Sequence, residues 1–290
     1  MLENDFVFAE KTMKYQSTLK KIVTAAGELA LRMQAEIDPE RVDTKATEKD
    51  IVTQADRAVE NFLRSELQRN WPGYAFYGEE SCGDAPVQGA GPHAEGAPDQ
   101  YTWVVDPIDG TLSYVMRQPF WCVSVGLWKN GRPVAGCVCA PVLRETYYAE
   151  AGAGAFCNDR PIHARRHGTL KDAVLSTGFS CIRSGWTQVN NLKYFSALSL
   201  TCRGVRRFGS AAMDINLVAS GRLDGFWELN LHPYDIGAAW LVLSEAGGVI
   251  SDLHGGQRFP EEGILAVSTP ELQAEMLKYF RDYQRPAAAK

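Results

Sequence analysis

A buried strand that ends in two acidic residues is predicted by the stretch Trp103-Val104-Val105-Asp106-Pro107-Ile108-Asp109-Gly110-Thr111. The apolar run ends at Asp106, because Pro107 lacks a backbone donor and restricts the preceding residue to extended conformations. Gly110 permits a tight turn, and Thr111 begins a helical pattern whose free N–H groups can cradle an anion. A spacing of three residues across such a turn can direct the Asp106 and Asp109 carboxylates toward one point in space.

Two more acidic segments lie far from this stretch in the sequence. Glu79 follows a short apolar run, and Asp235 opens a helical pattern that closes near Glu245, which we interpret as a structural partner. If Glu79, Asp106, Asp109 and Asp235 shared one pocket, each like-charge pair at about 4 Å would cost about 4 kcal/mol at an effective dielectric of about 20. Such groups must either take up protons or bind divalent cations. We expect cations, and with them phosphate chemistry.

Most of these residues also have a plainer structural interpretation. Asp235 alone could cap its helix, a contribution of about 1 kcal/mol. Glu79 and Glu80 could be a solvated pair before a loop, and Thr53 and Asp56 have the spacing of a capping box. The residues alone leave these alternatives open. Turn and cap chemistry does not, however, require an acid at the end of the apolar strand.

Spacing excludes several other kinds of site. Phosphatases of the haloacid-dehalogenase type have a nucleophilic aspartate two residues before the second one, where this chain has Pro107. The calcium loop D-x-[DN]-x-[DN]-G is absent, and no CxxC or paired Cys/His spacing indicates zinc. Ser113 and Cys122 belong to no placed catalytic set, so we interpret them as structural.

Composition and charge are those of an ordinary globular protein. The chain has 290 residues, of which 45% are hydrophobic and 22% charged, which suits a single large domain with approximate halves at 1–180 and 181–290. Its formal net charge of −5 gives no reason to expect a nucleic-acid partner. The short basic clusters at 163–167 and 203–207 lack interleaved aromatic residues and are typical of solvated faces.

The sequence also predicts a cytoplasmic protein without a membrane anchor. It contains no run of 18 apolar residues, and its acidic start at 1–5 has no apolar segment of the signal-peptide kind. The seven cysteines form no framework spacing and predict reduced thiols. Cys137 and Cys139 fall on one face of a predicted strand.

The apolar periodicity predicts a mixture of helices and strands in alternating layers, an α+β or α/β fold. Helices are predicted at 19–37, 54–70, 187–198, 211–220, 235–246 and 270–283. Strands are predicted at 74–77, 102–105, 122–128, 132–140, 146–149, 173–177, 204–208 and 226–229. Asn130-Gly131 is a strong hairpin turn signal, and the Gly-, Ala- and Pro-rich segment 81–100 predicts an exposed, mobile loop.

These motifs resemble the inositol monophosphatase family of magnesium-dependent, lithium-sensitive phosphatases, over nearly the whole chain. The first signature is matched by Asp106-Pro107-Ile108-Asp109-Gly110-Thr111 with Pro119 beyond it. The second is matched by Tyr234-Asp235-Ile236-Gly237-Ala238-Ala239 through Glu245-Ala246-Gly247-Gly248. Further segments follow in the family's order: Asp50-Ile51-Val52-Thr53-x-x-Asp56, Gly78-Glu79-Glu80-Ser81 and Gly152-x-Gly154-x-x-Cys157-Asn158.

The resemblance implies a five-layered αβαβα sandwich, with the layers alternating between helices and sheets. It implies that Glu79, Asp106 and the Ile108 carbonyl bind one Mg²⁺. Asp106, Asp109 and Asp235 would bind a second, and Glu79 with water a third, weaker one. Hard cations prefer such carboxylate and carbonyl oxygens.

Catalytic roles are implied for Thr111, Asp56 and Glu79, with Thr111 and Asp56 together orienting and deprotonating the attacking water. Lys45 matches a basic residue on a loop near the active site. Contacts with the substrate, either with its phosphate or with its alcohol portion, are implied for Asp109, Gly110, Thr111, Gly209, Ser210, Ala211 and Glu228. Two departures bear on the pocket wall and on substrate choice: Tyr234 stands where the family usually has Trp, and 112–114 read Leu-Ser-Tyr instead of Thr-Asn-Phe.

We therefore expect a Mg²⁺-dependent phosphomonoesterase that hydrolyses inositol 1-phosphate or a similar small polyol phosphate with metal-activated water. The charge of Glu228 would discourage a second phosphate, which favours a monophosphate. Fructose 1,6-bisphosphate, histidinol phosphate, NADP and adenosine 3′,5′-bisphosphate remain alternatives within the family. A non-catalytic regulatory module on the same fold is an alternative of another class, although the intact acidic cluster argues against it. The resemblance also suggests a homodimer.

Overall fold

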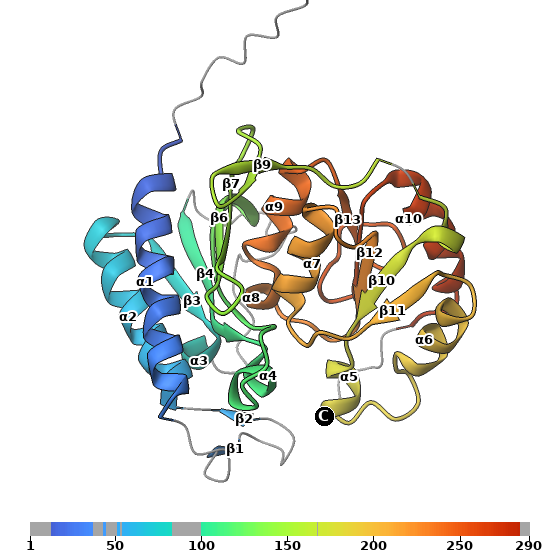
Figure 1. The fold of residues 1–290 in the computed structure, drawn as a ribbon, viewed down its shortest axis with the longest axis horizontal. Coiled ribbons are helices and arrows are strands. Elements are labelled where there is room, and N and C mark those ends of the chain that lie inside the picture. Colours follow the sequence, from blue (N-terminus) through green and yellow to red (C-terminus); the bar gives the residue numbers. More distant parts are fainter. Residues whose placement is uncertain are drawn as a thin grey trace, which may run out of the picture.

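The computed structural model describes residues 13–36, 43–44, 51–52, 54–82, 100–166 and 168–284. Two β-sheets stand roughly side by side in Figure 1, with helices between them and on both outer sides. Among the described residues, no helix has the length and apolar character needed to cross a membrane.

The first outer layer consists of helices α1 (Gln16–Gln34) and α2 (Gln54–Asn70). Leu19, Val23 and Ala26 recur at helical spacing and are fully buried against the first sheet. The N-terminus of α1 is held by Glu150, whose carboxylate accepts hydrogen bonds from the backbone N–H groups of residues 14–16 at 2.7–3.0 Å. This contact ties the start of α1 to strand β7 (Glu145–Glu150) of the sheet.

The first sheet has seven strands in the order β3-β4-β5-β6-β7-β8-β9, and all neighbours are antiparallel except β3 and β4. The strands are β3 (Ala75–Gly78), β4 (Tyr101–Asp109), β5 (Cys122–Lys129), β6 (Arg132–Ala140), β7 (Glu145–Glu150), β8 (Ala155–Cys157) and β9 (Arg160–Ile162). The predicted hairpin at Asn130-Gly131 is confirmed, since both residues have positive φ (52° and 72°) and join β5 to β6.

The middle layer consists of α7 (Ala211–Ala219), α8 (Pro233–Ile236) and α9 (Ala239–Glu245). Its helices reach the first sheet at two glycines. A Cβ added at Gly126 would lie 2.4 Å from the Gly237 carbonyl oxygen, and one at Gly136 would lie 2.7 Å from the Ala238 carbonyl oxygen. Backbone therefore meets backbone where the chain passes from α8 to α9.

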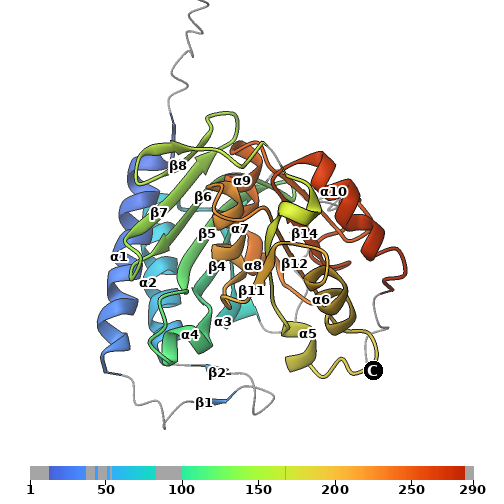
Figure 2. The same ribbon diagram turned by 45° about the vertical axis from the view of Figure 1, so that its right-hand side comes forward.

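The second sheet has five strands in the order β11-β10-β12-β14-β13. They are β10 (Val174–Thr177), β11 (Gly204–Arg206), β12 (Gly225–Glu228), β13 (Val249–Ser251) and β14 (Ile264–Val267). Its far side is covered by α6 (Leu192–Ser199) and α10 (Pro270–Met276), which lie toward the right in Figures 1 and 2. Three separate apolar cores fill the spaces between these layers, so the predicted five-layered sandwich is confirmed.

Smaller elements complete the described chain. They are β1 (Asp43–Thr44), β2 (Ile51–Val52), α3 (Glu79–Cys82), α4 (Thr111–Val115), α5 (Ser180–Arg183) and the 3₁₀ turns Leu170–Asp172 and Leu277–Tyr279. Helix α3 occupies the start of the segment that was predicted to be a loop from residue 81; positions 83–99 of that loop lie outside the described residues.

Several predicted boundaries differ from the structure. The predicted helix 235–246 is two helices, because Gly237 and Ala238 pack against the first sheet. The predicted helix 187–198 begins only at Leu192. The Asn191 side chain, which precedes it, donates to Thr177 Oγ1 (2.6 Å) and accepts from Trp227 Nε1 (2.6 Å). The helix predicted for 270–283 ends at Met276. Strands β8, β9, β13 and β14 were not predicted.

The six cysteines whose side chains the structure describes are free. Cys137 and Cys139 are buried in the same core, as their spacing predicted. Burial raises the pKa of the Cys122 thiol well above its ordinary value, which makes it a poor nucleophile at neutral pH and supports its interpretation as structural.

Candidate active site

Asp106 and Asp109 lie at the end of β4, where the strand pairing contains an irregularity. Asp106 lies opposite Ser124 and Asp109 opposite Cys122, so the two residues between the aspartates face a single residue of β5. Such a bulge bends a strand and redirects its side chains. Both carboxyl groups are buried, and Asp106 Oδ1 accepts the Ile108 N–H at 3.1 Å.

Asp235 reaches the same place from the start of α8. One carboxylate oxygen from each of Asp106, Asp109 and Asp235 lies within 4.8 Å of the others. Asp235 also has a structural role, since its Oδ2 accepts the His232 N–H at 2.5 Å in a capping box. We call these three residues the acidic cage. The two acidic motifs predicted from the sequence thus meet, although more than 120 residues separate Asp109 from Asp235.

Glu79 lies beside the cage because β3 runs parallel to β4. Gly78 pairs with Val105 in this register, so the next residues along the two strands are Glu79 and Asp106. The following turn is fixed by Glu60, which is buried on α2 and accepts the Glu80 N–H at 2.8 Å. The sequence did not single out Glu60; its position on the buried face of an amphipathic helix was the available signal.

The negative charges of the cage and of its acidic neighbours repel one another. Burial, followed by the charge of Glu79, raises the pKa of Asp106 well above its ordinary value, with smaller contributions from Asp109, Asp235 and Asp56. Burial and the charge of Asp109 raise the pKa of Asp235 in the same way. Burial also raises the pKa of Asp109 to about 6, although hydrogen bonds from Ser210 and Ala212 oppose the shift.

The cage has the properties of a divalent-cation site. None of its three carboxylates forms an ion pair with a lysine or arginine among the residues described. Buried carboxylates gathered without a cationic side chain are stable as anions only if a bound cation neutralises them. An all-oxygen donor set suits hard cations such as Mg²⁺. The residues present therefore fit a metal.

A second group of contacts orients Asp109. Its Oδ2 accepts a hydrogen bond from Ser210 Oγ (2.6 Å) and another from the Ala212 N–H (2.7 Å), both at the start of α7. Ser210 also caps that helix by accepting the Met213 N–H. Ser210 and Ala211 were predicted as substrate contacts; the role of Ser210 and Ala212 in fixing Asp109 was not predicted.

The turn after Asp109 brings Gly110 and Thr111, the predicted phosphate-binding residues, against the 209–211 segment. Gly110 has φ 97°, and a Cβ there would lie 3.0 Å from the Phe120 carbonyl oxygen and 3.2 Å from that of Gly209. Only glycine fits both constraints. Thr111 begins α4, as predicted, and its hydroxyl donates to the Ile108 carbonyl oxygen at 3.2 Å.

Asp56 is buried in the first turn of α2 and lies close enough to the cage to raise the pKa of Asp106. Its predicted capping partner Thr53 and the predicted loop residue Lys45 lie outside the described residues. The structure therefore places Asp56 near the site, and the predictions for Thr53 and Lys45 stay predictions.

Glu228, which was predicted to contact the substrate's alcohol, lies at the end of β12, and its charge adds to the burial that raises the pKa of Asp109. It is buried, and its Oε1 accepts the Ser180 N–H at 3.0 Å. Burial raises the pKa of Glu228, whereas the Ser180 hydrogen bond and the nearby charges of Arg183 and Arg207 lower it. The sequence predicted Glu228 but neither of the two arginines near it.

The layered fold, with an acidic cage built from the end of β4 and the first turn of α8, is that of metal-dependent phosphomonoesterases. The family model for the inositol monophosphatase family matches residues 12–285. The chain therefore belongs to this family.

Curated relatives and solved structures agree with this assignment. Over 229 residues the chain is 39% identical to an inositol-1-monophosphatase from Mesorhizobium japonicum, covering 79% of this chain and 82% of that one. It is 34% identical to the Nus factor SuhB of Pseudomonas aeruginosa, covering 91% and 94%. A solved inositol monophosphatase from Anabaena (Nostoc) sp. PCC 7120 superposes with a TM-score of 0.77 at 31% identity, covering 92% of this chain and 95% of that one.

Proposed function

We propose that the chain hydrolyses a phosphate monoester of a small polyol, such as inositol 1-phosphate, to the free alcohol and inorganic phosphate with Mg²⁺ as cofactor. The observation that carries the proposal is the acidic cage, in which three carboxylate oxygens converge within 4.8 Å. Relatives that bear the name inositol-1-monophosphatase support the choice of substrate.

Asp106, Asp109 and Asp235 would hold Mg²⁺, together with Glu79 and the Ile108 carbonyl, and two or three ions fit this donor set. Bound there, Mg²⁺ neutralises phosphate charge and lowers the pKa of water. The fixed hydrogen bonds from Ser210 and Ala212 to Asp109 keep its free oxygen directed into the cage.

The remaining residues act on the water, the phosphate and the alcohol. The Thr111 hydroxyl already donates its proton to the Ile108 carbonyl, so its oxygen lone pairs remain to accept a hydrogen bond from the attacking water. Asp56 is the proposed acceptor of the water proton. The Gly110 and Thr111 amides bind the phosphate oxygens, and the Gly209–Ala211 segment and Glu228 bind the alcohol. Phosphoryl transfer goes directly to water, and no protein nucleophile is needed.

A second candidate substrate carries another anionic group on its alcohol. The observation that favours it is the pair of arginines, Arg183 and Arg207, whose charges lower the pKa of Glu228. The Arg207 guanidinium also lies against Gly209, since a Cβ there would be 2.5 Å from Arg207 Nη1. Two cations offset the charge of Glu228, which removes the main argument against a bisphosphate such as fructose 1,6-bisphosphate.

A panel of phosphorylated metabolites, assayed for phosphate release with Mg²⁺ and with or without Li⁺, tests both candidates. Release from inositol 1-phosphate that Li⁺ inhibits supports the first, and release restricted to bisphosphates supports the second. Release from no ester by protein that binds Mg²⁺ would overturn the enzymatic proposal. That result would favour a regulatory role of the kind that the name Nus factor SuhB gives to some relatives.

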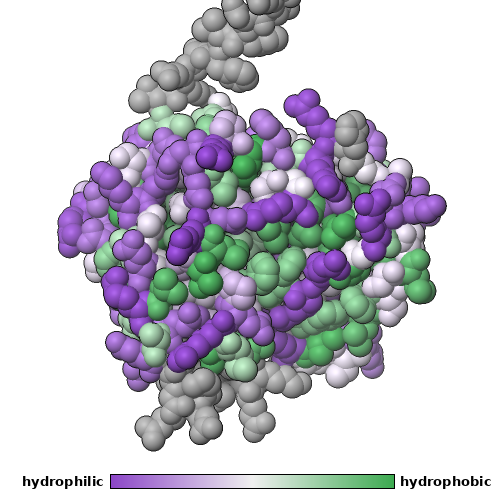
Figure 3. Space-filling model, viewed as in Figure 1, coloured by the Kyte–Doolittle hydropathy of each residue, from purple (hydrophilic) through white to green (hydrophobic). Residues whose placement is uncertain are grey.

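Homodimer formation and a cytoplasmic location stay predictions. Figure 3 shows hydrophilic side chains around the rim of one face and hydrophobic ones gathered nearer its middle. Large apolar side chains are exposed at α4 and directly after it, where Leu112 is 43% and Met116 58% accessible. Sedimentation analysis of the purified chain measures its assembly state directly.

A further inference from the structure

Asn191 stands at the N-cap position of α6 but does not cap that helix. Its side chain forms no hydrogen bond with the first turn of α6, although asparagine at this position normally accepts one from the backbone. The side chain instead turns into the protein and is fully buried. Burying an amide costs free energy unless its polar groups find partners. The inward contacts of Asn191 therefore take the place of the cap.

The Asn191 amide joins the ends of two neighbouring strands, β10 and β12. Its Nδ2 donates to Thr177 Oγ1 and to the Gly178 carbonyl oxygen, both at 2.6 Å, and its Oδ1 accepts from Trp227 Nε1 at 2.6 Å. The Thr177 hydroxyl in turn donates to the Trp227 carbonyl oxygen at 2.6 Å. Both amide hydrogens of Asn191 thus have acceptors, and its oxygen has a donor. We call Asn191, Thr177 and Trp227 the strand-end network.

The strand-end network and Glu228 lie on opposite faces of the same two strand ends. Thr177 and Trp227 are paired in the parallel register of β10 and β12, so the residues that follow them, Gly178 and Glu228, face the other side together. The two cores show this alternation. Trp227 belongs to the core shared with α6 and α10, and Phe226 belongs to the core shared with α7. Glu228 therefore points to the α7 side, where the acidic cage lies.

The Gly178 backbone lies directly against the Glu228 carboxylate. A Cβ added at Gly178 would lie 2.1 Å from both Oε1 and Oε2 of Glu228. The Ser180 N–H donates to Oε1 at 3.0 Å, and the Ser180 hydroxyl contacts the carbonyl oxygens of the two residues after Glu228 at 2.7 and 2.9 Å. The segment 177–180 therefore places the carboxylate, and the strand-end network fixes this segment relative to β12.

We propose that Asn191 and Thr177 are positioning residues for Glu228 and, through it, for the alcohol portion of the substrate. This inference rests on the proposed function, in which Glu228 binds the alcohol. Asn191 and Thr177 are fully buried and do not touch the substrate themselves. They hold the Gly178 backbone against the end of β12, which sets the point where the carboxylate meets a substrate hydroxyl. A displacement of about 1 Å at such a contact can cost about 100-fold in rate.

Two phosphate esters separate this role from a general loss of structure. Inositol 1-phosphate offers hydroxyl groups to Glu228, whereas phenyl phosphate offers none. Thr177→Val keeps the shape of the side chain and removes its hydroxyl. We expect it to lower kcat/KM for inositol 1-phosphate by roughly 10- to 100-fold and to leave kcat/KM for phenyl phosphate nearly unchanged. Thr177→Ser keeps the hydroxyl and should retain the wild-type preference. An equal loss with both esters in Thr177→Val would make the network purely structural and overturn the proposal.

Asn191→Leu removes the amide with little change in side-chain size, and we expect the same selective loss of kcat/KM. Its melting temperature reports whether it folds, and Thr177→Val provides the test if it does not. The matched control is Thr269→Val, which also exchanges a buried hydroxyl for a methyl group.

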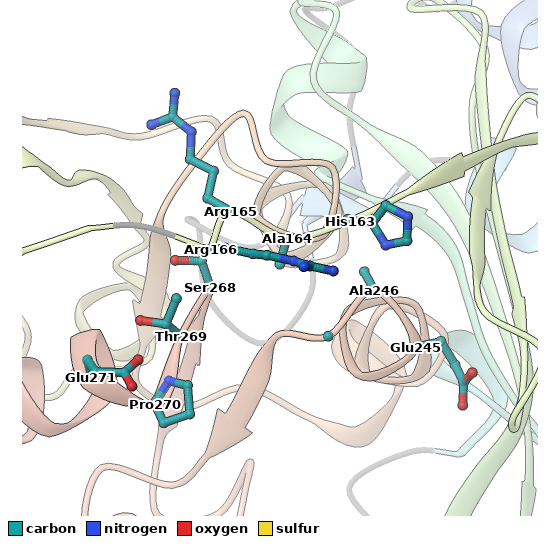
Figure 4. Close-up of a pocket in the computed structure, with 11 residues that line it drawn as sticks. His163, Ala164, Arg165, Arg166, Glu245, Ala246, Ser268, Thr269, Pro270 and Glu271 are labelled. Atoms are coloured by element: carbon teal, nitrogen blue, oxygen red, sulfur yellow. The ribbon is translucent and has the colours of Figure 1, made fainter. Parts of the chain in front are cut away.

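Thr269 is a suitable control because it is remote from Glu228. Its hydroxyl accepts the Leu272 N–H at 3.2 Å, and it lies beside a separate pocket (Figure 4). Gly225 pairs with Val267, so Thr269 lies beyond the opposite end of β12 from Glu228. Thr269→Val should lower the melting temperature and leave the preference between the two esters unchanged. A changed preference in this control would show that the preference reports stability, which would overturn the proposal.

Glu228→Gln distinguishes a failure of this inference from a failure of the proposed function. It changes the proposed substrate contact itself and should show the same selective loss for inositol 1-phosphate. If Glu228→Gln is selective and Thr177→Val is not, the positioning role is overturned and the proposed function stands. If Glu228→Gln affects both esters equally, or if the wild-type protein hydrolyses neither ester with Mg²⁺, the proposed alcohol contact fails and the positioning role fails with it.

Discussion

Asp109 and Ser210 are joined by a hydrogen bond of 2.6 Å between side chains that are 101 positions apart in the chain. Asp109 comes from the first sheet and Ser210 from the helix that leads out of the second sheet. The bond therefore links the two halves of the sandwich at the acidic cage. As a proposed metal ligand, Asp109 is held in place by this bond before a cation binds, which reduces the ordering needed on binding.

Replacing Ser210 with alanine should weaken both the helix and the cage. Loss of the α7 cap should lower the free energy of unfolding by about 1 kcal/mol. Loss of the bond to Asp109 should also weaken Mg²⁺ binding about tenfold. The matched control is Thr269→Ala, which removes the corresponding cap of α10 and should destabilise by about 1 kcal/mol with no change in Mg²⁺ affinity. Equal Mg²⁺ affinity in both variants, measured by titration calorimetry, would show that Ser210 is only a cap.

Asp106→Asn should abolish most activity and leave the fold intact. Loss of even an outer hydrogen-bond partner of a metal ligand typically costs about 10- to 100-fold, so loss of a ligand should cost roughly 100-fold or more. The melting temperature without metal should not fall, because the change removes a buried carboxylate whose charge is disfavoured by burial and by the charges of Glu79 and Asp109. Asp172→Asn, at an exposed position, is the control. Near wild-type turnover by Asp106→Asn at modest Mg²⁺ would contradict the ligand role.

The acidic cage illustrates what could be predicted from the sequence. Asp106 and Asp109 were predictable because proline and glycine fix the local backbone around them, and a local turn is encoded by adjacent residues. Asp235 was predictable as an acid at a helix start. That it meets the other two depends on the packing of α8 against the first sheet, which the motif resemblance supplied and local patterns did not.

The contacts that hold the site together were mostly not predictable. Ser180, whose N–H binds Glu228, lies in a four-residue helix too short to show a period. The strands β13 and β14 have three and four residues, and such short apolar runs do not distinguish a strand from a buried helix. The division of the predicted helix 235–246 arises from a backbone contact with Gly126 and Gly136 across the sandwich, a long-range effect that leaves no local pattern.

Mg²⁺ should stabilise the protein more strongly as pH rises. Burial raises the pKa of Asp109 from 3.8 to about 6 in the folded chain. Between these values the folded state binds more protons than the unfolded state, so without metal the free energy of unfolding falls as pH increases. Asp106 and Asp235 are shifted in the same direction, which extends the window above 6. Bound Mg²⁺ removes this penalty by neutralising the carboxylates.

Melting temperatures with Mg²⁺ and with a chelator, recorded from about pH 5 to about pH 8, measure the effect. The difference between the two conditions should grow with pH. In Asp106→Asn the growth should be smaller, because one of the titrating carboxylates is gone. A constant difference across the range would mean that the cage carboxylates are not the groups that bind the cation.

Arg207→Gln should separate the two candidate substrates. If the alcohol carries a second anionic group, loss of this cation should lower kcat/KM for that substrate by roughly 10- to 100-fold, as expected for one lost charge-assisted hydrogen bond. The same variant should affect a polyol monophosphate much less. Arg203→Gln, an exposed arginine of the same segment that pairs with Asp172, is the control. If kcat/KM falls equally for the monophosphate and the bisphosphate, Arg207 maintains the shape of the site and does not select the substrate.

Gly136→Ala tests the close approach of the middle helices to the first sheet. The added Cβ would meet three backbone atoms of Ala238, at 2.7, 3.0 and 3.2 Å. Backbone cannot move aside as a flexible side chain can, so we expect a loss of about 1–3 kcal/mol in the free energy of unfolding, the usual cost of overpacking. Gly168→Ala is the matched control, because its Cβ would meet only Asp224 Oδ1, at 3.9 Å, and its effect should stay within about 0.5 kcal/mol. Because the α8–α9 junction also positions Asp235, Gly136→Ala should weaken Mg²⁺ binding as well. A stability loss with unchanged Mg²⁺ affinity would show that the cage tolerates displacement of this junction.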